Sequence, residues 1–224
     1  TLANFKRLLN VSSGLILRTF GNSIFVAASY TALSCLLASM AGYAFAKFKF
    51  RGRNVLFLIL LITMMIPAEL NITPLYLIFS KMKWLNTYRV QIIPGAANVF
   101  AMFLMRQYMM SIPDSLIEAA RIDGAGELKI YSQIVFPMCK PGLATLVVFT
   151  FNFMWNDYMA PMIYLTSDKL RTIQIGLASF RTQYGSEYGL IMAGTVCALI
   201  PMLLIFIVGQ KYLVEGIAFS GLKG

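Results

Sequence analysis

The sequence contains no histidine, and only nine of its 224 residues are acidic. Without histidine, no imidazole can act as a general base or as a zinc ligand. The three cysteines, Cys35, Cys139 and Cys197, lie far apart and form no Cys-X-X-Cys pair, which argues against a zinc site and against a disulfide framework. We therefore expect no catalytic residue and no bound metal in this chain.

Charge is also scarce, because only 12% of the residues are charged whereas 58% are hydrophobic and the mean hydropathy is +0.72. Soluble domains carry about 25% charged residues. This composition predicts an all-α, polytopic integral membrane protein, since a membrane-crossing helix needs about 20 apolar residues. We expect five transmembrane helices, over residues 20–46, 55–79, 90–110, 143–165 and 189–213.

The net charge of +10 does not indicate a nucleic-acid partner, because the basic residues lie between the expected spans rather than in one stripe with aromatics. They are typical of anchors beside a membrane. The positive-inside rule barely discriminates between the two possible orientations in the membrane, because ten Lys and Arg lie on the expected cytoplasmic side and nine on the other. One local cluster does favour the cytoplasm: Lys47, Lys49, Arg51 and Arg53.

The C-terminal segment imitates a phosphate-binding loop, with glycines at 216 and 221. In that motif a Lys directly follows the second glycine and a Ser or Thr comes next, so that both reach the phosphates and the magnesium. Here Leu222 follows the glycine, and Lys223 precedes a glycine. We therefore expect no nucleotide site and no enzyme activity in this chain, and any ATP hydrolysis has to come from a separate subunit.

A polar segment at 111–140 separates two of the apolar stretches. Pro113 suits the first turn of a helix, and Gly124 suits the left-handed turn that ends one. These signals predict a short helix over 113–123. A second helix is expected from Glu127 to Phe136, with Ile130 and Ile134 on one face, ending before Pro137 because proline cannot continue a helix.

The same segment carries six residues at fixed spacing within the run EAARIDGAGELKIYSQIVFP, namely Glu118, Ala119, Ala120, Gly124, Ile134 and Pro137. They resemble the EAA loop of binding-protein-dependent ATP-binding-cassette (ABC) importer permeases, with Phe136 where that motif has Leu. The stretches AKFKFRGR, MMIPAELNITPLY, WND and QKYLVEGIAFSGLKG are similar to the permeases of the carbohydrate-uptake type, except that the usual Ala-Val before the last Lys-Gly is replaced.

The resemblance implies a single permease domain over 1–224 that moves a sugar or oligosaccharide inward across the bacterial plasma (inner) membrane by ATP-driven alternating access. It implies a second permease subunit, an ABC ATPase dimer that binds ATP and Mg, and an extracellular or periplasmic solute-binding protein. That protein would face the loop at 167–187, and the tail at 220–224 would reach toward the ATPase. An additional N-terminal span, the sixth, is apparently missing from this chain.

Within this family the cytoplasmic loop, here 111–140, is a coupling element seated on the ATPase. The residues that carry over to this role are Glu118, Ala119, Ala120, Asp123, Gly124, Ile134 and Pro137. Ala119 and Ala120 would leave a nearly flat surface for close docking. The alternative is an ordinary solvated loop between two spans.

Two carboxylates fall inside expected spans, where insertion of a charge is costly and the group usually faces protein or a water-filled cavity. Counted along continuous helices at 1.5 Å per residue, Glu69 and Asp157 both lie roughly 22 Å from the cytoplasmic ends. Asn152, Trp155 and Asn156 share a helical face and offer an indole and two amides, which suit a sugar ring. These five residues are our candidates for a substrate pathway, and the alternative is packing and interfacial anchoring by the same side chains.

Small residues recur every four positions in the first expected span, at Ser34, Ala38, Gly42 and Ala46. This stripe predicts close packing of a neighbouring helix. Prolines inside expected spans indicate kinks of either structural or functional origin, at Pro67, Pro74 and Pro201.

Other functions stay open at this point. An ABC permease for glycerol phosphate, polyamine, phosphate or amino acids is the main alternative, although a phosphate ester would favour basic residues along the path and we find none there. A fragment of an ion-coupled secondary carrier or channel, with Glu69 and Asp157 as coupling carboxylates, would have no use for an EAA surface.

Overall fold

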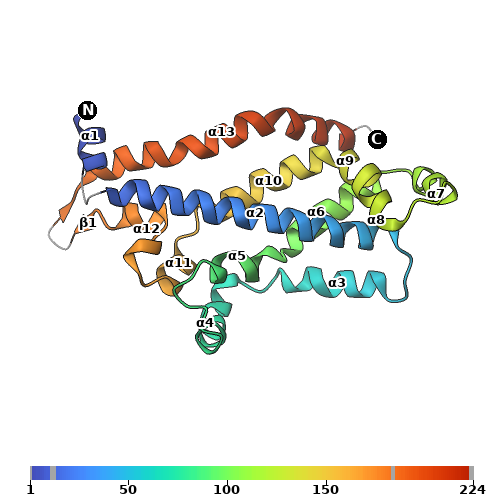
Figure 1. Cartoon of the computed structure of the whole chain (residues 1–224), viewed down its shortest axis with the longest axis horizontal. Helices are drawn as coiled ribbons and strands as arrows, with labels where there is room; N and C mark the ends of the chain where they lie inside the picture. Colours follow the sequence, from blue (N-terminus) through green and yellow to red (C-terminus); the bar gives the residue numbers. More distant parts are fainter. Residues whose placement is uncertain (1, 11–13, 183–184, 222–224) are drawn as a thin grey trace. The chain divides into compact units, whose positions relative to one another are not determined.

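The computed structural model describes residues 2–10, 14–182 and 185–221. In these residues the chain is helical, apart from an antiparallel pair of two-residue strands, β1 (Arg181–Thr182) and β2 (Gly185–Ser186) (Figure 1). The all-α expectation is thus confirmed at the level of fold class. Residues 183–184 of the expected extracellular loop and 222–224 of the expected tail lie outside the described residues.

The chain divides into two compact units, and the long helices α2 (Leu15–Lys47), α10 (Lys140–Trp155) and α13 (Tyr188–Gly221) contribute to both. Unit 1 takes residues 1–30, 71–94 and 151–207. Its remaining helical elements are α1 (Leu2–Asn10), α4 (Ile72–Lys81), most of α5 (Arg89–Ala96), α11 (Met159–Tyr164), η4 (Asp168–Leu170) and α12 (Ile173–Ala178).

The core of unit 1 forms around buried apolar side chains from α2, α10, α12 and α13. Trp155 and Ile173 are at most 1% exposed and lie in one cluster with Tyr30, Leu177 and Ala193. Leu177 packs so closely on α13 that a Cβ placed on Gly194 would lie 2.3 Å from its Cδ2 atom.

Unit 2 takes residues 31–70, 95–150 and 208–224 and contains the EAA segment. Its remaining elements are α3 (Arg53–Thr63), η2 (Ala68–Asn71), α6 (Val99–Met110), α7 (Asp114–Ile122), α8 (Glu127–Ile130), the π-helical turn η3 (Tyr131–Val135) and α9 (Phe136–Met138).

In unit 2 the stripe of small residues on α2 packs as predicted. Ser34 and Ala38 are at most 3% exposed. A Cβ on Gly42 would lie 2.8 Å from Met105 Cβ and 2.9 Å from the backbone nitrogen of Arg106, so α6 approaches α2 at this point closely enough to exclude any side chain. The predicted packing role of the stripe is confirmed for these residues.

Two helices are long and apolar enough to cross a membrane without a break, over Leu15–Lys47 and Tyr188–Tyr212, and they match the first and last predicted spans. Two further pairs of helices pass the same test only together, so the described residues hold up to four such segments by this measure. The three middle predicted spans, over 55–79, 90–110 and 143–165, are each interrupted between two helices. The interruption of the first of these lies at Pro67, where a kink was expected.

The breaks have local causes. Proline lacks the N–H for the helical hydrogen bond and disfavours the helical conformation of the preceding residue, and α3 ends at Thr63, four residues before Pro67. Pro94 lies within α5, and α6 begins at Val99 after the N-cap residue Asn98, whose side chain accepts a hydrogen bond of 2.9 Å from the backbone nitrogen of Ala101. In the fourth segment, α10 ends at Trp155 and α11 starts at Met159.

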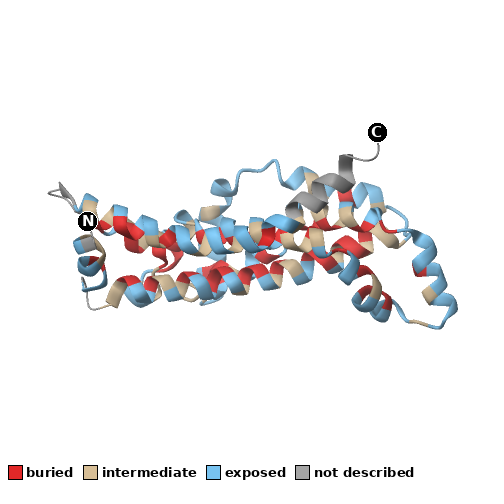
Figure 2. Cartoon of the chain, turned by 90° about the horizontal axis from the view of Figure 1, so that it is seen from above, coloured by how far each residue is buried: buried red, intermediate tan, exposed pale blue. Residues whose placement is uncertain are grey.

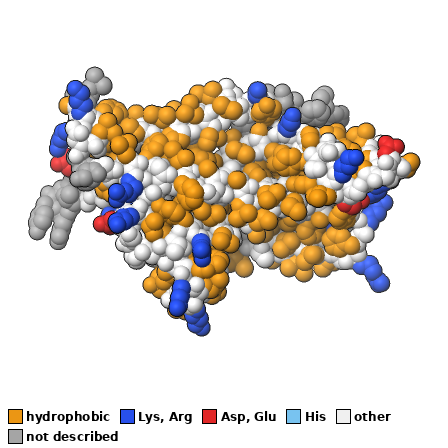
Figure 3. Space-filling view, in the orientation of Figure 1, with side chains coloured by type: hydrophobic (Ala, Val, Ile, Leu, Met, Phe, Trp, Pro, Cys, Tyr) orange, Lys and Arg blue, Asp and Glu red, His pale blue; other side chains and the backbone are white. Residues whose placement is uncertain are grey.

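Large apolar side chains remain exposed along several helices. Figure 2 shows exposed positions alternating with buried ones along the helices, and Figure 3 shows hydrophobic side chains over much of the visible face. Leu58 on α3 is 58% exposed, and Leu203 and Val208 on α13 are 55% and 69% exposed. A soluble surface seldom carries apolar patches of this extent, so these faces fit contact with lipid or with another membrane subunit.

Candidate functional site: the EAA segment and the amide cluster

The helix α7 follows the predicted boundaries closely, because it begins after Pro113 and ends at Ile122. Asp114 lies in its first turn, where a negative charge favours the positive end of the helix dipole. Gly124 has φ +79° and takes the left-handed conformation that was predicted for it.

The turn after α7 is a Schellman motif. The backbone N–H of Gly124 donates to the carbonyl oxygen of Arg121 at 3.0 Å, and the N–H of Ala125 donates to the carbonyl of Ala120 at 2.9 Å. These two bonds satisfy carbonyl groups that the end of a helix would leave unpaired. Ala120 and Ala125, the two residues joined by this second bond, both pack against the core of unit 2.

The second short helix starts at Glu127 as predicted, but it does not end before Pro137. It passes through the π turn η3 and continues to Met138. A π turn uses bonds to the fifth residue back rather than the fourth, which accommodates a residue that lacks an N–H. The expectation that Pro137 terminates this helix is therefore wrong.

The π turn also shifts the buried face. Ile130 and Val135 are both fully buried, whereas Ile134, predicted to share a face with Ile130, is only half-buried. An α-helix brings residues i and i+4 together, and the extra residue in the π turn moves that partnership to i+5. The pairing of Ile130 with Ile134 was thus off by one residue.

The predicted contact residues of α7 differ in exposure. Glu118, Ala119, Asp123 and Gly124 are exposed, but Ala120 is half-buried against the core. The flat surface expected from Ala119 and Ala120 is therefore only half present. Larger apolar groups that the sequence reasoning did not single out are open to solvent instead: Leu116 is 44%, Leu128 73% and Ile122 86% exposed.

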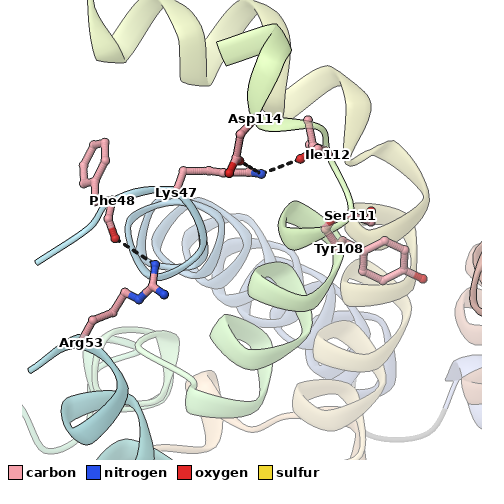
Figure 4. A network of polar contacts seen from close by, with 7 residues as sticks. All are labelled: Lys47, Phe48, Arg53, Tyr108, Ser111, Ile112 and Asp114. Carbon is pink, nitrogen blue, oxygen red and sulfur yellow. Dashed lines mark hydrogen bonds and ion pairs between the residues drawn. The ribbon is translucent and has the colours of Figure 1, made fainter. Parts of the chain in front are cut away.

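Lys47, at the C-terminal end of α2, holds the start of α7 in place (Figure 4). Its Nζ atom donates to the carbonyl oxygen of Ile112 and to Oδ1 of Asp114, both at 2.6 Å. The Lys47 side chain is 4% exposed, while that of Asp114 is 68% exposed. The hydrogen bond and the positive charge of Lys47 lower the pKa of Asp114 below its ordinary value.

Glu127 joins three elements of unit 2. Its Oε1 atom accepts a hydrogen bond from Arg121 Nε and its Oε2 atom accepts one from the Tyr43 hydroxyl, each at 2.8 Å. Because Arg121 belongs to α7, Tyr43 to α2 and Glu127 to α8, this single carboxylate ties both short helices to α2.

A groove of about 320 Å³ lies beside Glu118, between α7 and the chain that leaves α2. It is lined by Lys47, Phe48, Lys49, Asp114, Ile117, Glu118 and Arg121. Five of these seven residues are charged, and they carry both signs, so the groove suits a polar polypeptide surface better than a small anion.

A second polar site lies at the end of α10 in unit 1. Asn152 and Asn156 are exposed, and Asn156 Nδ2 donates to the side-chain oxygen of Asn152 at 2.8 Å. Gln174 Nε2 on α12 donates to Asn156 Oδ1 at 3.3 Å, which completes a cluster of three amides. Gln174 was not predicted, and its separation of 18 residues from Asn156 gives no periodic signal.

Trp155 does not face the same space as these amides. It is 1% exposed, stacks on Phe151 with ring centroids 5.6 Å apart, and meets Phe20 edge-on at 5.4 Å. Its Nε1 donates to the carbonyl oxygen of Ala198 at 3.1 Å. The expectation of a free indole face for a sugar is therefore not met, and Trp155 is a core residue of unit 1.

The two carboxylates of the expected pathway lie at helix breaks. Asp157 is half-buried between α10 and α11, and its Oδ1 accepts a hydrogen bond from the backbone nitrogen of Ala160 at 3.3 Å, which satisfies the start of α11. Glu69 is exposed in η2. The depth estimate assumed continuous helices, so the break between Thr63 and Ala68 invalidates it for Glu69. For Asp157 the count runs along α10, which is unbroken from Lys140 to Trp155.

Comparison with known proteins identifies the chain. Residues 34–218 match the family model described as "Binding-protein-dependent transport system inner membrane component". The arabinooligosaccharides transport system permease protein of Halalkalibacterium halodurans is 38% identical over 224 residues, covering 100% of this chain and 80% of that protein. The sn-glycerol-3-phosphate transport system permease protein of Shigella flexneri is 36% identical over 201 residues, covering 89% of this chain and 72% of that protein.

Among solved structures, a chain of a bacterial ABC transporter involved in the import of the acidic polysaccharide alginate superposes with a TM-score of 0.83 and 28% identity. That likeness covers 94% of this chain and 79% of the other. The chain therefore belongs to the family of binding-protein-dependent transport system inner membrane components, the permease subunits of ABC importers.

Proposed function

We propose that this chain is a non-catalytic permease subunit that carries a sugar or oligosaccharide inward through the bacterial plasma (inner) membrane. Residues 1–224 act as one permease domain, in which each interrupted segment counts as a single crossing and the crossings number five. A separate ABC ATPase dimer binds ATP and Mg and supplies the energy. A second permease subunit and a solute-binding protein complete the transporter, which works by alternating access.

The segment 111–140 is the proposed contact with the ATPase. The observation that carries this assignment is the exposed end of α7, where the Schellman turn at Gly124 leaves Ile122 open to solvent beside the exposed Glu118. Moving an apolar side chain of this size from water into a protein cleft is favourable, so an exposed Ile122 favours docking of a partner protein. Glu118, Ala119, Asp123 and Gly124 would line the docked surface, and the half-buried Ala120 and Ile134 would support it. Pro137, which is exposed on the second helix, is a further candidate for the contact.

The proposal of a sugar rests on the amide cluster and on the relatives. Asn152, Asn156 and Gln174 offer donors and acceptors without a charge, which suits the hydroxyl groups of a neutral sugar. A phosphate ester would favour Lys or Arg at such a site. The glycerol phosphate permease among the relatives is therefore a less supported indication of the substrate than the sugar permeases. The name of the arabinooligosaccharide permease supports the same choice, and the alginate transporter supports a saccharide, although an acidic one. Asp157 and Glu69 remain candidates for the path, and Trp155 is no longer one.

The coupling assignment is tested by Glu118→Lys and Gly124→Asp in the full transporter. Both variants should remain in the membrane but lose the ATPase subunit on co-purification, because one reverses a charge and the other strains the turn at the docked surface. The chain purified alone should bind no ATP, whereas the full assembly should hydrolyse ATP faster when loaded binding protein is added. Normal ATPase retention together with normal uptake in both variants would rule out this assignment.

A further inference from the structure

Three polar side chains of α2 lie at intervals of four residues and therefore on one face of that helix: Ser39, Tyr43 and Lys47. Each makes a hydrogen bond to a different element of the EAA segment. Ser39 Oγ and the Tyr131 hydroxyl lie 2.7 Å apart, the Tyr43 hydroxyl donates to Glu127 Oε2 at 2.8 Å, and Lys47 Nζ donates to Asp114 Oδ1 at 2.6 Å.

On the α2 side all three polar groups are buried, since Ser39 is fully buried, Tyr43 is 5% exposed and the Lys47 side chain is 4% exposed. Their bonds differ in exposure: the bond between Ser39 and Tyr131 is buried, the bond from Tyr43 to Glu127 is part-buried, and the bond from Lys47 reaches the exposed carboxylate of Asp114. A buried polar group that loses its partner is poorly placed to bind water instead, so a broken bond costs most at Ser39 and Tyr43. The ring centroids of Tyr43 and Tyr131 also lie 5.5 Å apart, so the two residues that make the bonds to Glu127 and Ser39 contact each other.

The remaining contacts of the segment with the core of unit 2 are mainly apolar, through Ile112, Ile117 and Ile130. The hydrophobic effect is non-directional. Hydrogen bonds require a defined distance and angle. The three polar contacts therefore add a defined geometry to the apolar packing of α7, α8 and η3 on α2.

We propose that Ser39, Tyr43 and Lys47 form a three-point attachment that makes the segment 111–140 move as one body with the 31–47 part of α2. They act as positioning residues, because they touch neither solute nor ATPase. The inference rests on the proposed coupling function. A displacement of α7 by the ATPase would then reach α2 directly, and a weakened attachment would let the ATPase cycle without moving the spans.

The test uses the reconstituted full transporter with its binding protein and measures solute transported per ATP hydrolysed. Tyr43→Phe removes one hydroxyl and keeps the ring. It should lower this ratio roughly fivefold, the effect of one lost buried hydrogen bond, while the ATPase subunit stays bound. Tyr108→Phe is the matched control, because the Tyr108 hydroxyl has no hydrogen-bond partner within the part of the chain that the structure describes, and this variant should keep the wild-type ratio.

Lys47→Met should lower the ratio further, since it removes the bonds to both Ile112 and Asp114, and Lys47→Arg should restore part of it. If Lys47→Met does not accumulate in the membrane, Asp114→Asn tests the same contact from its exposed side and should lower the ratio mildly. Wild-type ratios in Tyr43→Phe and in whichever of these two variants accumulates would overturn the inference.

The experiments distinguish a failure of the coupling function from a failure of the three-point attachment. If Glu118→Lys keeps the ATPase and transports normally, the coupling function itself is wrong. If Glu118→Lys loses the ATPase while the attachment variants keep the wild-type ratio, only the three-point attachment is wrong.

Discussion

Replacement of Gly124 by alanine isolates the backbone strain at the end of α7. The residue has φ +79°, and a Cβ placed there would meet no atom within 4 Å, so the substitution creates no clash. The cost comes from the left-handed conformation alone, about 1–2 kcal/mol for a residue that carries a Cβ. That energy raises the population of the opened turn by roughly 5- to 30-fold.

Gly126→Ala is the matched control for this substitution. Gly126 lies two residues away, has φ −71°, and a Cβ there would also meet no atom within 4 Å. Alanine adopts this conformation without strain. Both substitutions add the same methyl group to the same exposed loop, and they differ only in the sign of φ.

Hydrogen exchange in the assembled transporter measures the effect at the two amides of the turn. In Gly124→Ala, the amides of residues 124 and 125 should lose roughly 5- to 30-fold of their protection, because they bond the carbonyls of Arg121 and Ala120. Retention of the ATPase on co-purification should fall as well, and Gly124→Asn should lie between alanine and wild type because asparagine tolerates this conformation. Identical exchange and retention in Gly124→Ala and Gly126→Ala would refute the reasoning.

Three further outcomes are expected. Gly42→Ala should destabilise the protein by about 1–3 kcal/mol because its Cβ meets Met105 at 2.8 Å, whereas Gly21→Ala, with no atom within 4 Å of its Cβ, should not; thermal unfolding in detergent compares them. Trp155→Phe should cost about 2–4 kcal/mol of stability, through the cavity left in the core and the lost bond to Ala198, and leave solute affinity in uptake unchanged. A lower affinity without loss of stability would restore the stacking role. Asn156→Ala should raise the solute concentration for half-maximal uptake several-fold, because Asn156 bonds both other amides of the cluster, Asn152 and Gln174. The free binding protein should keep its affinity for the solute.

The sequence was sufficient to predict the features that depend on local chemistry. Pro113 and Gly124 delimited α7 within one residue, because helix ends are determined by the conformations that these two residue types allow. The stripe containing Gly42 predicted close packing, since a helix can approach only where side chains are absent. The six spaced residues of the EAA segment were enough to indicate the family.

Features that depend on tertiary contacts could not be predicted in the same way. The spacing of Asn152, Trp155 and Asn156 predicted one shared face, but the contacts with Phe20 and Ala198 place the indole in the core, away from the two exposed amides. Gln174 joins the amides from another helix. The four-residue spacing of Ser39, Tyr43 and Lys47 was present in the sequence, yet no periodicity reveals which partners such side chains will find.

The π turn at Tyr131–Val135 has a consequence for how much the length of this segment can vary. A π turn contains one residue more than the α-helical turn it replaces, so a deletion of one residue within 131–135 would convert it to regular α-helix. After the loss of one residue between 131 and 134, Val135 would be the fourth residue after Ile130 instead of the fifth and would stay on the same buried face. The positions that follow would therefore keep their orientation, whereas the ring of Pro137 would meet an α-helical carbonyl four residues back. The segment should therefore tolerate the loss of this one residue in its packing and be strained mainly at Pro137.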